Sequence, residues 1–436
     1  MCRAVQCRRR IHAQFSLPGA PDRGTSYSPA QLALGKQLGK GGFGEVYQGV
    51  LVLARGEQQQ VVLKRVKDTV KRAAELQESE HLLSAYASWA ARDSVAQFLG
   101  FCDVVRATSR LSKGLWLVWA YQGSNTLAHY LKQRNCLQGL ARDLCVHEDV
   151  VVPTVMQHIL RCLEELHAVG LVHRDVKPGN LLLCEHSRRI KLIDLGAACD
   201  LRSGTNYLPT ETINDPCYCP PEEFVLPTNA PHLSRHAAPL ALALSPLLWA
   251  QHRPGCFDSY SAGVTLLQLA LPPLRTTRAL REFRRDLALR GGDLREWRAR
   301  AGLAARDTLL LDARGGEGWD LAQGLLRPRK IVVEQSGHVK FTDLPGAAPR
   351  LTAAGALKHS FIKRAAAPTL QGSGGSNKPA AVLGSLFGSL ANTLSSGDDL
   401  TPSNPVIHAG AGGRASRGRG GSAQRGAGLW GLGARP

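Results

Sequence analysis

The chain has 436 residues, 44% of them hydrophobic, and a formal net charge of +19 at pH 7. This length suits one large two-lobed domain with tails, or two ordinary domains. Eleven cysteines scattered through apolar segments exclude a disulfide framework, and the longest apolar stretch, 237–250, is interrupted by Pro239 and Pro246 and is too short for a membrane span of ~18–20 residues.

The basic residues are unevenly distributed, and both ends of the chain are poor in acidic residues. Residues 1–30 contain five Arg and one Asp, and they lack the apolar core of a secretory signal. This composition resembles an organelle transit peptide, although a disordered start or a truncated gene sequence would give the same pattern. An excess of basic residues suits binding to nucleotide phosphates, acidic proteins, anionic membranes and nucleic acids, and it does not discriminate among these partners.

A glycine-rich segment follows at 34–49. It reads G-x-G-x-F-G-x-V, and the residues of this pattern are Gly39, Gly41, Phe43, Gly44 and Val46. Glycines allow the backbone of a hairpin to lie over phosphates without side-chain obstruction, and Val46 can cover an adenine. A dinucleotide-binding fold would place a helix directly after such a loop, whereas here a polar stretch and another strand follow. We therefore expect an ATP-binding β-hairpin.

The next predicted strand, 61–66, carries Lys64, which we expect to contact the α- and β-phosphates of ATP. Val62 of the same strand is assigned to the ATP site. The helical segment that follows contains several acidic residues, and one of them should pair with Lys64, because such an ion pair fixes the lysine against the phosphates. We select Glu80, with Glu78 as the alternative.

Residues 116–123 predict a buried strand that ends in a hinge. Trp119 should stand at the back of the adenine pocket, and the backbone of Ala120 and Gln122 should hydrogen-bond the base. A large aromatic side chain at this point predicts a shallow back pocket that excludes bulky inhibitors. Later in the chain, Leu182 should pack below the adenine.

The strongest motif lies at 173–180, where the sequence reads H-R-D-x-K-x-x-N. In this pattern an Asp accepts the proton of a substrate hydroxyl, a Lys neutralises the migrating phosphoryl group and an Asn holds a metal ion. The corresponding residues are Asp175, Lys177 and Asn180. An apolar run then leads to Asp194 in Asp-Leu-Gly, where a second Mg²⁺ ligand is expected. These residues predict phosphoryl transfer with ATP and Mg²⁺ as cofactors.

The segment from Asp194 to Glu222 should face the substrate and control activity. Arg174 usually contacts a phosphorylated residue in such a segment, and the candidate phosphate acceptors are Thr205, Thr210 and Thr212. Surface threonines without that role would look the same in the sequence.

Three residues are expected to hold the C-terminal part together. Glu222 should pair with Arg350, and Asp258 should bind the backbone of the catalytic loop. The stretch 328–349 looks foreign to this arrangement and is either an insertion or an artefact of the gene sequence. From 365 to 436 the chain is rich in Gly, Ser, Ala and Arg, and we expect a disordered tail without clear nucleic-acid binding.

In their order along the chain, these motifs resemble the eukaryotic-type protein kinase family. The resemblance implies an α+β fold, the bilobal protein kinase fold, with the domain at 31–364. A small β-rich N-lobe at 31–122 would precede a larger α-helical C-lobe at 123–364. The Lys177 of H-R-D-x-K is typical of Ser/Thr rather than Tyr kinases. Asp215 stands where many Ser/Thr kinases have a Thr, and we expect it to pair with Lys177.

A narrower resemblance rests on the segments 192–202, 206–209, 244–249 and 257–258. They are similar to the chloroplast thylakoid kinases of plants and algae, and within these to the branch that phosphorylates photosystem II core proteins rather than the related state-transition kinases. The resemblance implies thylakoid membrane proteins as substrates, a chloroplast location and thylakoid association. The chain departs from this family by the lack of a clear membrane span. A pseudokinase scaffold that binds a partner protein, and a kinase of another plastid or cytosolic pathway, are the alternatives.

Overall fold

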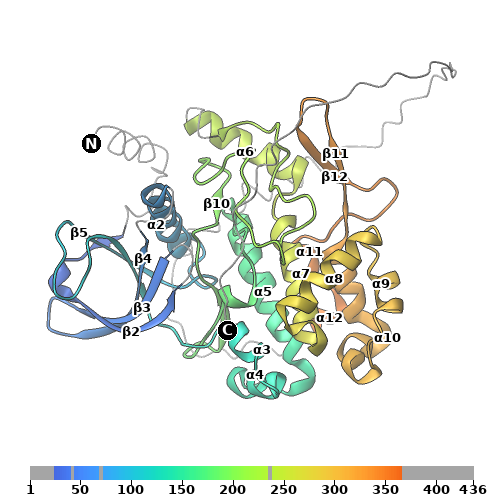
Figure 1. Ribbon diagram of the computed structural model, residues 1–436, viewed down its shortest axis with the longest axis horizontal. Coiled ribbons are helices and arrows are strands. Elements are labelled where there is room, and N and C mark those ends of the chain that lie inside the picture. The colour runs from blue at the N-terminus through green and yellow to red at the C-terminus, as the bar shows by residue number, and fades with distance from the viewer. Residues whose placement is uncertain (1–23, 41–43, 68–71, 234–237, 366–436) are drawn as a thin grey trace, which may run out of the picture. The chain divides into compact units, whose positions relative to one another are not determined.

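The structure is a computed structural model that describes residues 24–40, 44–67, 72–233 and 238–365 (Figure 1). The expectations for Gly41, for Phe43 and for the tail from 366 onward, and most of those for 1–30, lie outside these residues. The described chain has a β-rich N-terminal region and a helical C-terminal region, which confirms the α+β kinase fold class.

The N-terminal region is built on a six-stranded sheet of order β1-β5-β6-β4-β3-β2. Its strands are β1 (Thr25–Ser26), β2 (Leu32–Lys40), β3 (Gly44–Val52), β4 (Gln58–Val66), β5 (Phe98–Val104) and β6 (Gly114–Ala120). Apolar and polar side chains alternate along β4, where Val61 and Leu63 are fully buried. This period-2 pattern is typical of a strand with one face in the core.

Strand register places the predicted nucleotide residues on adjacent strands. Val46 on β3 is opposite Lys64 on β4, and Val62 on β4 is opposite Trp119 on β6. Helix α2 (Ala73–Ala90) packs against β4 and β5 and carries Glu80. The sheet therefore brings together residues that lie far apart in the sequence.

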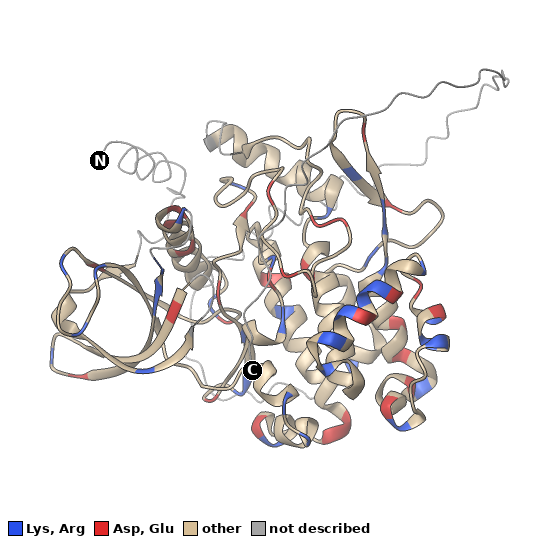
Figure 2. Ribbon diagram, viewed as in Figure 1, with Lys and Arg blue, Asp and Glu red and all other residues tan. Residues whose placement is uncertain are grey.

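The C-terminal region is organised around α5 (Val151–Ala168) and α7 (Cys256–Ala270), which pack against each other. All fifteen residues of α7 are buried, as expected for a helix that is enclosed on every side. Outer helices such as α8 bury one apolar stripe, here Leu280, Phe283 and Leu287, and carry their charged residues on the opposite face (Figure 2). The other helices are α3 (Leu127–Leu131), α4 (Cys136–Leu144), α6 (Ala238–His252), α8 (Thr277–Leu289), α9 (Leu294–Arg300), α10 (Ala305–Leu326), α11 (Ala353–Leu357) and α12 (Ser360–Lys363).

Two short ladders hold the catalytic loop. Strand β7 (Leu171–Val172) pairs with β10 (Cys199–Asp200), and β8 (Leu181–Cys184) pairs with β9 (Arg189–Leu192). The H-R-D motif follows β7 directly, and Asp194 follows β9. Both ladders pack on the buried helix α5. They therefore fix the positions at which the catalytic loop and Asp194 leave β7 and β9.

The stretch 328–349 folds into an antiparallel hairpin of β11 (Arg329–Val333) and β12 (Val339–Asp343). Phe341 and Arg329 are buried, and Arg253, just after α6, forms an ion pair of 2.9 Å with Asp343. These contacts attach the hairpin to the segment that follows α6. Within the residues that the structure describes, no helix is long and apolar enough to cross a membrane.

Candidate active site

Lys64 lies between two carboxylates that come from different elements. Its Nζ is 2.6 Å from Glu80 Oε1 on α2 and 2.8 Å from Asp194 Oδ1 after β9. The structure thus contains the Lys64–Glu80 pair that the sequence predicts, and Glu78 does not take this place. Burial would lower the pKa of Lys64, but the two carboxylates outweigh it and raise the pKa above its ordinary value.

Asp194 is held in its ionised form by its neighbours. Desolvation would raise its pKa, but Lys64 and the amide of Gly196, which donates to Oδ1 at 3.2 Å, lower the pKa to about 2. The side chain of Asp194 remains 45% exposed. An ionised, accessible carboxylate beside a lysine is suited to bind a metal ion next to a polyphosphate.

The catalytic loop gathers Asp175, Lys177 and Asn180 around one carboxylate. Asn180 Nδ2 donates to Asp175 Oδ2 at 2.8 Å and to the carbonyl of Asp175 at 2.9 Å. Lys177 Nζ lies 3.0 Å from the same Oδ2 atom. Burial raises the pKa of Asp175, and Lys177 offsets only part of this effect. A carboxylate with a raised pKa is a better proton acceptor than an ordinary aspartate.

Asp258 holds the backbone of the catalytic loop in place. It is fully buried on α7, and its two oxygens accept hydrogen bonds of 2.8 Å from the backbone amides of His173 and Arg174. His167 Nε2 lies 2.9 Å from Asp258 Oδ2. Burial would raise the pKa of Asp258, but the contact with His167 and the other neighbours lowers it. The sequence analysis missed His167, whose place on the last turn of α5 gave no signal of this contact.

The hinge follows β6. The amide of Ala120 donates to the carbonyl of Gln97 at 2.9 Å, and the carbonyl of Gln122 accepts from Glu185 at 2.9 Å. The Trp119 ring packs edge-on against Phe98, with 5.3 Å between ring centroids. Leu182 lies on β8, bridged to Thr126 after the hinge. The amide of Ala120 and the carbonyl of Gln122, two of the backbone groups expected to bind the base, therefore already have partners within the chain.

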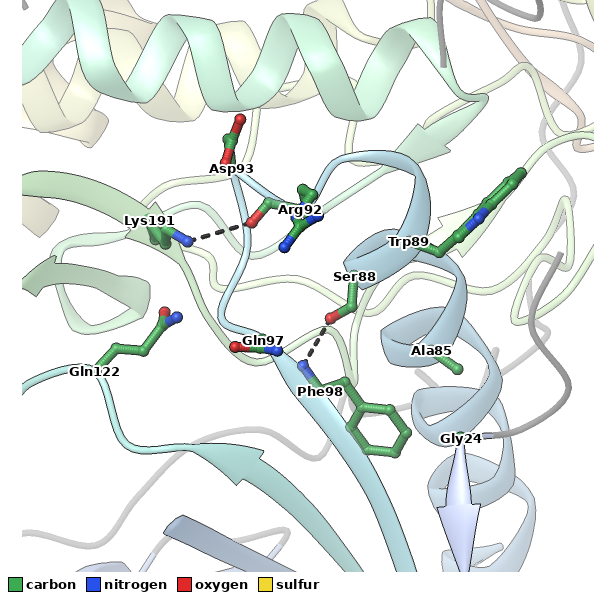
Figure 3. Close-up of a pocket in the computed structure, with 10 residues that line it drawn as sticks. All are labelled: Gly24, Ala85, Ser88, Trp89, Arg92, Asp93, Gln97, Phe98, Gln122 and Lys191. Atoms are coloured by element: carbon green, nitrogen blue, oxygen red, sulfur yellow. Dashed lines mark hydrogen bonds between the residues drawn. The ribbon is translucent and has the colours of Figure 1, made fainter. Parts of the chain in front are cut away.

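A cavity of about 320 Å³ lies between the C-terminal end of α2, the start of β5 and the hinge (Figure 3). Of the residues assigned to ATP, only Gln122 lines it, and Lys64, Asp175 and Asp194 do not. Ser88 accepts from the amide of Phe98 at 2.7 Å, and Lys191 donates to the carbonyl of Arg92 at 3.2 Å. This cavity is separate from the phosphate-handling residues.

The glycine-rich hairpin is described on both sides of its tip. Gly39 on β2 is opposite Val46 on β3, and Gly44 is opposite Val66. A Cβ atom on Gly44 would lie 2.6 Å from the carbonyl oxygen of Arg65, so only glycine fits against this neighbouring strand. The tip itself, with Gly41 and Phe43, lies outside the described residues.

Arg174 is engaged by the backbone of the activation segment. Its guanidinium donates to the carbonyls of Ala197 at 2.5 Å, Asn206 at 2.7 Å and Ala198 at 3.4 Å. The expected partner was a phosphorylated side chain, and this structure instead satisfies the arginine with carbonyl oxygens. Thr205 is buried, which leaves Thr210 and Thr212 as the exposed candidates.

A buried polar cluster, which the sequence analysis missed, braces the same segment. Arg202 makes two hydrogen bonds of 2.9 Å to the carboxylate of Asp200, donates to the hydroxyl of Tyr86 on α2, and lies 4.1 Å over the Tyr86 ring. Ser203 donates to Asp200 at 2.9 Å. Because Tyr86 and Glu80 share α2, the cluster links the activation segment to the helix that holds Lys64.

The end of the segment is held by Asp215 and Glu222. Lys177 Nζ is 3.4 Å from Asp215 Oδ2, as the sequence predicts, and the amide of Cys217 donates to the other oxygen at 3.0 Å. Glu222 forms a buried two-pronged pair with Arg350, at 2.6 and 3.1 Å. These contacts anchor the surface on which a substrate would lie.

These features define the protein kinase class. A glycine-rich hairpin is followed by a strand whose lysine pairs with a helix, then by a catalytic loop and a second acidic residue. The protein kinase domain family matches residues 32–238. The chain belongs to the serine/threonine protein kinases, and it shares a family with two chloroplast kinases of Arabidopsis thaliana.

The similarity to these relatives is extensive. Serine/threonine-protein kinase STN8, chloroplastic, is 37% identical over 361 residues, with 75% of this chain and 69% of that kinase covered. Serine/threonine-protein kinase STN7, chloroplastic, is 36% identical over 350 residues, covering 76% of this chain and 57% of that kinase. A crystal structure of a Stt7 homolog from Micromonas algae, soaked with ATP, matches with a TM-score of 0.63 and 32% identity, over 79% of this chain and 94% of that one.

Proposed function

We propose that this serine/threonine protein kinase transfers the γ-phosphoryl group of ATP to Ser or Thr hydroxyls of thylakoid proteins, with photosystem II proteins as the substrate class. The observation that carries the proposal is the position of Lys64 Nζ between Glu80, at 2.6 Å, and Asp194, at 2.8 Å. This arrangement aligns a phosphate-binding lysine with a metal-binding carboxylate, as an active kinase requires.

ATP would lie along the hairpin, the hinge and β8. The residues assigned to it are Gly39, Gly41, Phe43, Gly44, Val46, Val62, Lys64, Trp119, Ala120, Gln122 and Leu182. The Stt7 homolog from Micromonas algae was soaked with ATP, which supports the same nucleotide here.

Mg²⁺ would be held by Asn180 and Asp194. The amide and carboxylate oxygens of these residues suit a hard cation. The remaining ligands of the cation would come from phosphates and water. When bound, Mg²⁺ neutralises charge on the β- and γ-phosphates.

Asp175 and Lys177 perform the chemistry at the acceptor. The substrate oxygen forms a bond to the γ-phosphorus while the bond from that phosphorus to the β,γ-bridging oxygen breaks, and the hydroxyl proton passes to the carboxylate of Asp175. Asn180 orients this carboxylate through its 2.8 Å hydrogen bond. Lys177 Nζ, which lies 3.0 Å from the Asp175 carboxylate, offsets the negative charge of the migrating phosphoryl group. Positioning and electrostatics therefore supply most of the rate enhancement.

The site and the relatives support a catalytic role over a scaffold. Lys64, Asp175, Asn180 and Asp194 are all present. Lys64 contacts Asp194, Asn180 contacts Asp175, and the carbonyl of Asn180 accepts from the amide of Ile193, next to Asp194. Both curated relatives are described as chloroplastic, which supports a chloroplast location and thylakoid partners for this chain. A membrane-associated protein substrate with an exposed Ser or Thr is the partner that this function requires.

The test uses purified full-length protein, Mg-ATP and isolated thylakoids, followed by mapping of phosphorylated sites by mass spectrometry. Asp175→Ala serves as the catalytically dead control at equal concentration. We expect Ser and Thr sites on photosystem II proteins that appear only with the unaltered kinase. Phosphorylation of generic substrates without any thylakoid site would refute the substrate class, and equal labelling by both proteins would refute the catalytic assignment.

A further inference from the structure

Strand β11 exposes three consecutive β-branched side chains. Ile331, Val332 and Val333 are 40%, 44% and 68% exposed, although they belong to an ordered hairpin (Figure 1). Successive residues of a strand point to opposite faces, so both faces of β11 are apolar and accessible at this end. Proteins usually protect such edges, because they pair readily with another strand.

The opposite strand of the hairpin is already attached to the body of the protein. The amide of Thr228 donates to the carbonyl of Val339 at 3.0 Å, and the amide of Val339 donates to the Thr228 hydroxyl at 2.7 Å. Phe341 of β12 is buried. Within the part of the chain that the structure describes, β11 pairs with β12 alone, which leaves its outer edge available.

The hydrogen-bond pattern shows which groups this outer edge presents. The amide of Glu334 donates to the carbonyl of His338 at 2.8 Å, so Glu334 faces β12. In an antiparallel ladder the hydrogen-bonded residues alternate. The backbone amide and carbonyl groups of Lys330 and Val332 therefore also point toward β12. The amide and carbonyl groups of Ile331 and Val333 therefore point away from the hairpin and can bond to another strand.

This edge is complementary to itself. In an antiparallel pair of two β11 strands centred on Val332, Ile331 of one copy lies opposite Val333 of the other, and their outward groups are in register to bond. The same register places the exposed Lys330 of each copy opposite Glu334 of the other. Within its own hairpin Glu334 already forms an ion pair of 2.6 Å with Lys340, so Lys330 of the second copy would join this pair. Opposite charges at facing positions stabilise a sheet, and like charges destabilise it.

We propose that β11 is a self-association edge, through which two copies of this chain join by a two-fold antiparallel strand pair that extends the β11–β12 hairpin into a four-stranded sheet. The charge complementarity of Lys330 and Glu334 selects a second copy as the occupant. A two-fold axis uses the same patch on both copies, which closes the assembly at a dimer. Because the paired strands are short, the dimer is expected to be weak and concentration-dependent.

The charges allow a direct test by sedimentation velocity on the full-length protein over a range of concentrations. The unaltered chain should dimerise as its concentration rises. Lys330→Glu makes every facing charge acidic and Glu334→Lys makes every facing charge basic, so each variant alone should dimerise about tenfold more weakly. An equimolar mixture of the two variants restores opposite charges at both positions and should dimerise again.

Backbone chemistry provides a second, independent test. Ile331→Pro removes an outward amide and leaves the hairpin's own hydrogen bonds in place, so it should abolish dimerisation while kinase activity toward a peptide is retained. Lys358→Glu, a charge reversal at a site remote from the hairpin in sequence, is the matched control and should dimerise like the unaltered chain. A chain that stays monomeric throughout, a dimer that survives Ile331→Pro, or a mixture no stronger than the separate variants would each overturn the proposal.

Discussion

Lys177 Nζ lies 3.0 Å from the carboxylate of Asp175 and 3.4 Å from that of Asp215. The lysine that neutralises the transferred phosphoryl group is thus shared between the catalytic base and the substrate-binding surface. The second carboxylate draws Lys177 away from Asp175 and adds negative charge nearby. Both effects leave Asp175 easier to protonate than it would be with a neutral residue at 215.

Asp215→Asn tests this sharing. The amide oxygen can still accept from Cys217, so the backbone contact is retained while the charge is lost. Asp175 needs to be ionised to act, and the pKa of Asp175 should fall when the charge at 215 is removed. The acidic limb of the plot of kcat/KM against pH should therefore move to lower pH. An unchanged acidic limb, with unchanged kcat, would show that Asp215 has only a structural role.

Glu80→Gln tests the ion pair that holds Lys64. A hydrogen bond to a charged group is worth about 1.5–3 kcal/mol, so kcat/KM should fall by roughly 10- to 100-fold. Glu75→Gln, on the exposed side of the same helix and bonded to Arg72, is the matched control and should leave the rate unchanged. Equal effects of the two substitutions would contradict the special position of Glu80.

Arg350→Ala tests the buried pair with Glu222. Both side chains are fully enclosed, and removal of Arg350 leaves the buried Glu222 carboxylate with only the longer contact of 3.9 Å to Arg329. We expect the free energy of unfolding, measured by urea denaturation, to fall by about 3–5 kcal/mol. Arg278→Ala breaks an exposed pair with Glu282 and should give no measurable change, since such surface pairs contribute little. Similar midpoints for the two variants would be inconsistent with this assignment.

The contacts of Arg174 predict activity without phosphorylation of the activation segment. Three carbonyls already satisfy the guanidinium, and Asp200 with Arg202 braces the same region. Phosphatase-treated kinase, and a Thr210→Ala/Thr212→Ala double variant, should therefore keep kcat within about twofold of the unaltered chain. The measurement is peptide phosphorylation after mass spectrometry has verified that no phosphate remains. Loss of activity that rephosphorylation restores would contradict this expectation.

The sequence predicted the contacts that depend on motif spacing. Lys64 with Glu80, Asp258 with the catalytic loop, and Glu222 with Arg350 each join residues whose positions follow from the order of the motifs. The structure also contains the unusual pair of Lys177 with Asp215. These predictions succeeded because the backbone positions of such motifs vary little once the fold is set.

Other features depend on tertiary packing that no local pattern encodes. Arg202 is buried only because Tyr86, distant in the sequence, covers it. Arg174 finds carbonyl partners because the activation segment turns back over it. The hairpin at 329–343 gave a weak strand signal, and its place in the fold follows from contacts of Val339 with Thr228 and of Asp343 with Arg253. In each case the contact is made with a residue far along the chain.

The most direct test of the phosphoryl-transfer site is single-turnover transfer from ATP to a Ser/Thr peptide by the unaltered kinase and by Asp175→Asn, with ATP affinity measured in parallel. Asp175→Asn removes the proton acceptor and leaves Lys64, Asn180 and Asp194 in place. We predict that the rate of transfer falls by more than about 10²-fold while the Kd for ATP stays unchanged. Transfer by Asp175→Asn at the rate of the unaltered kinase would contradict the account.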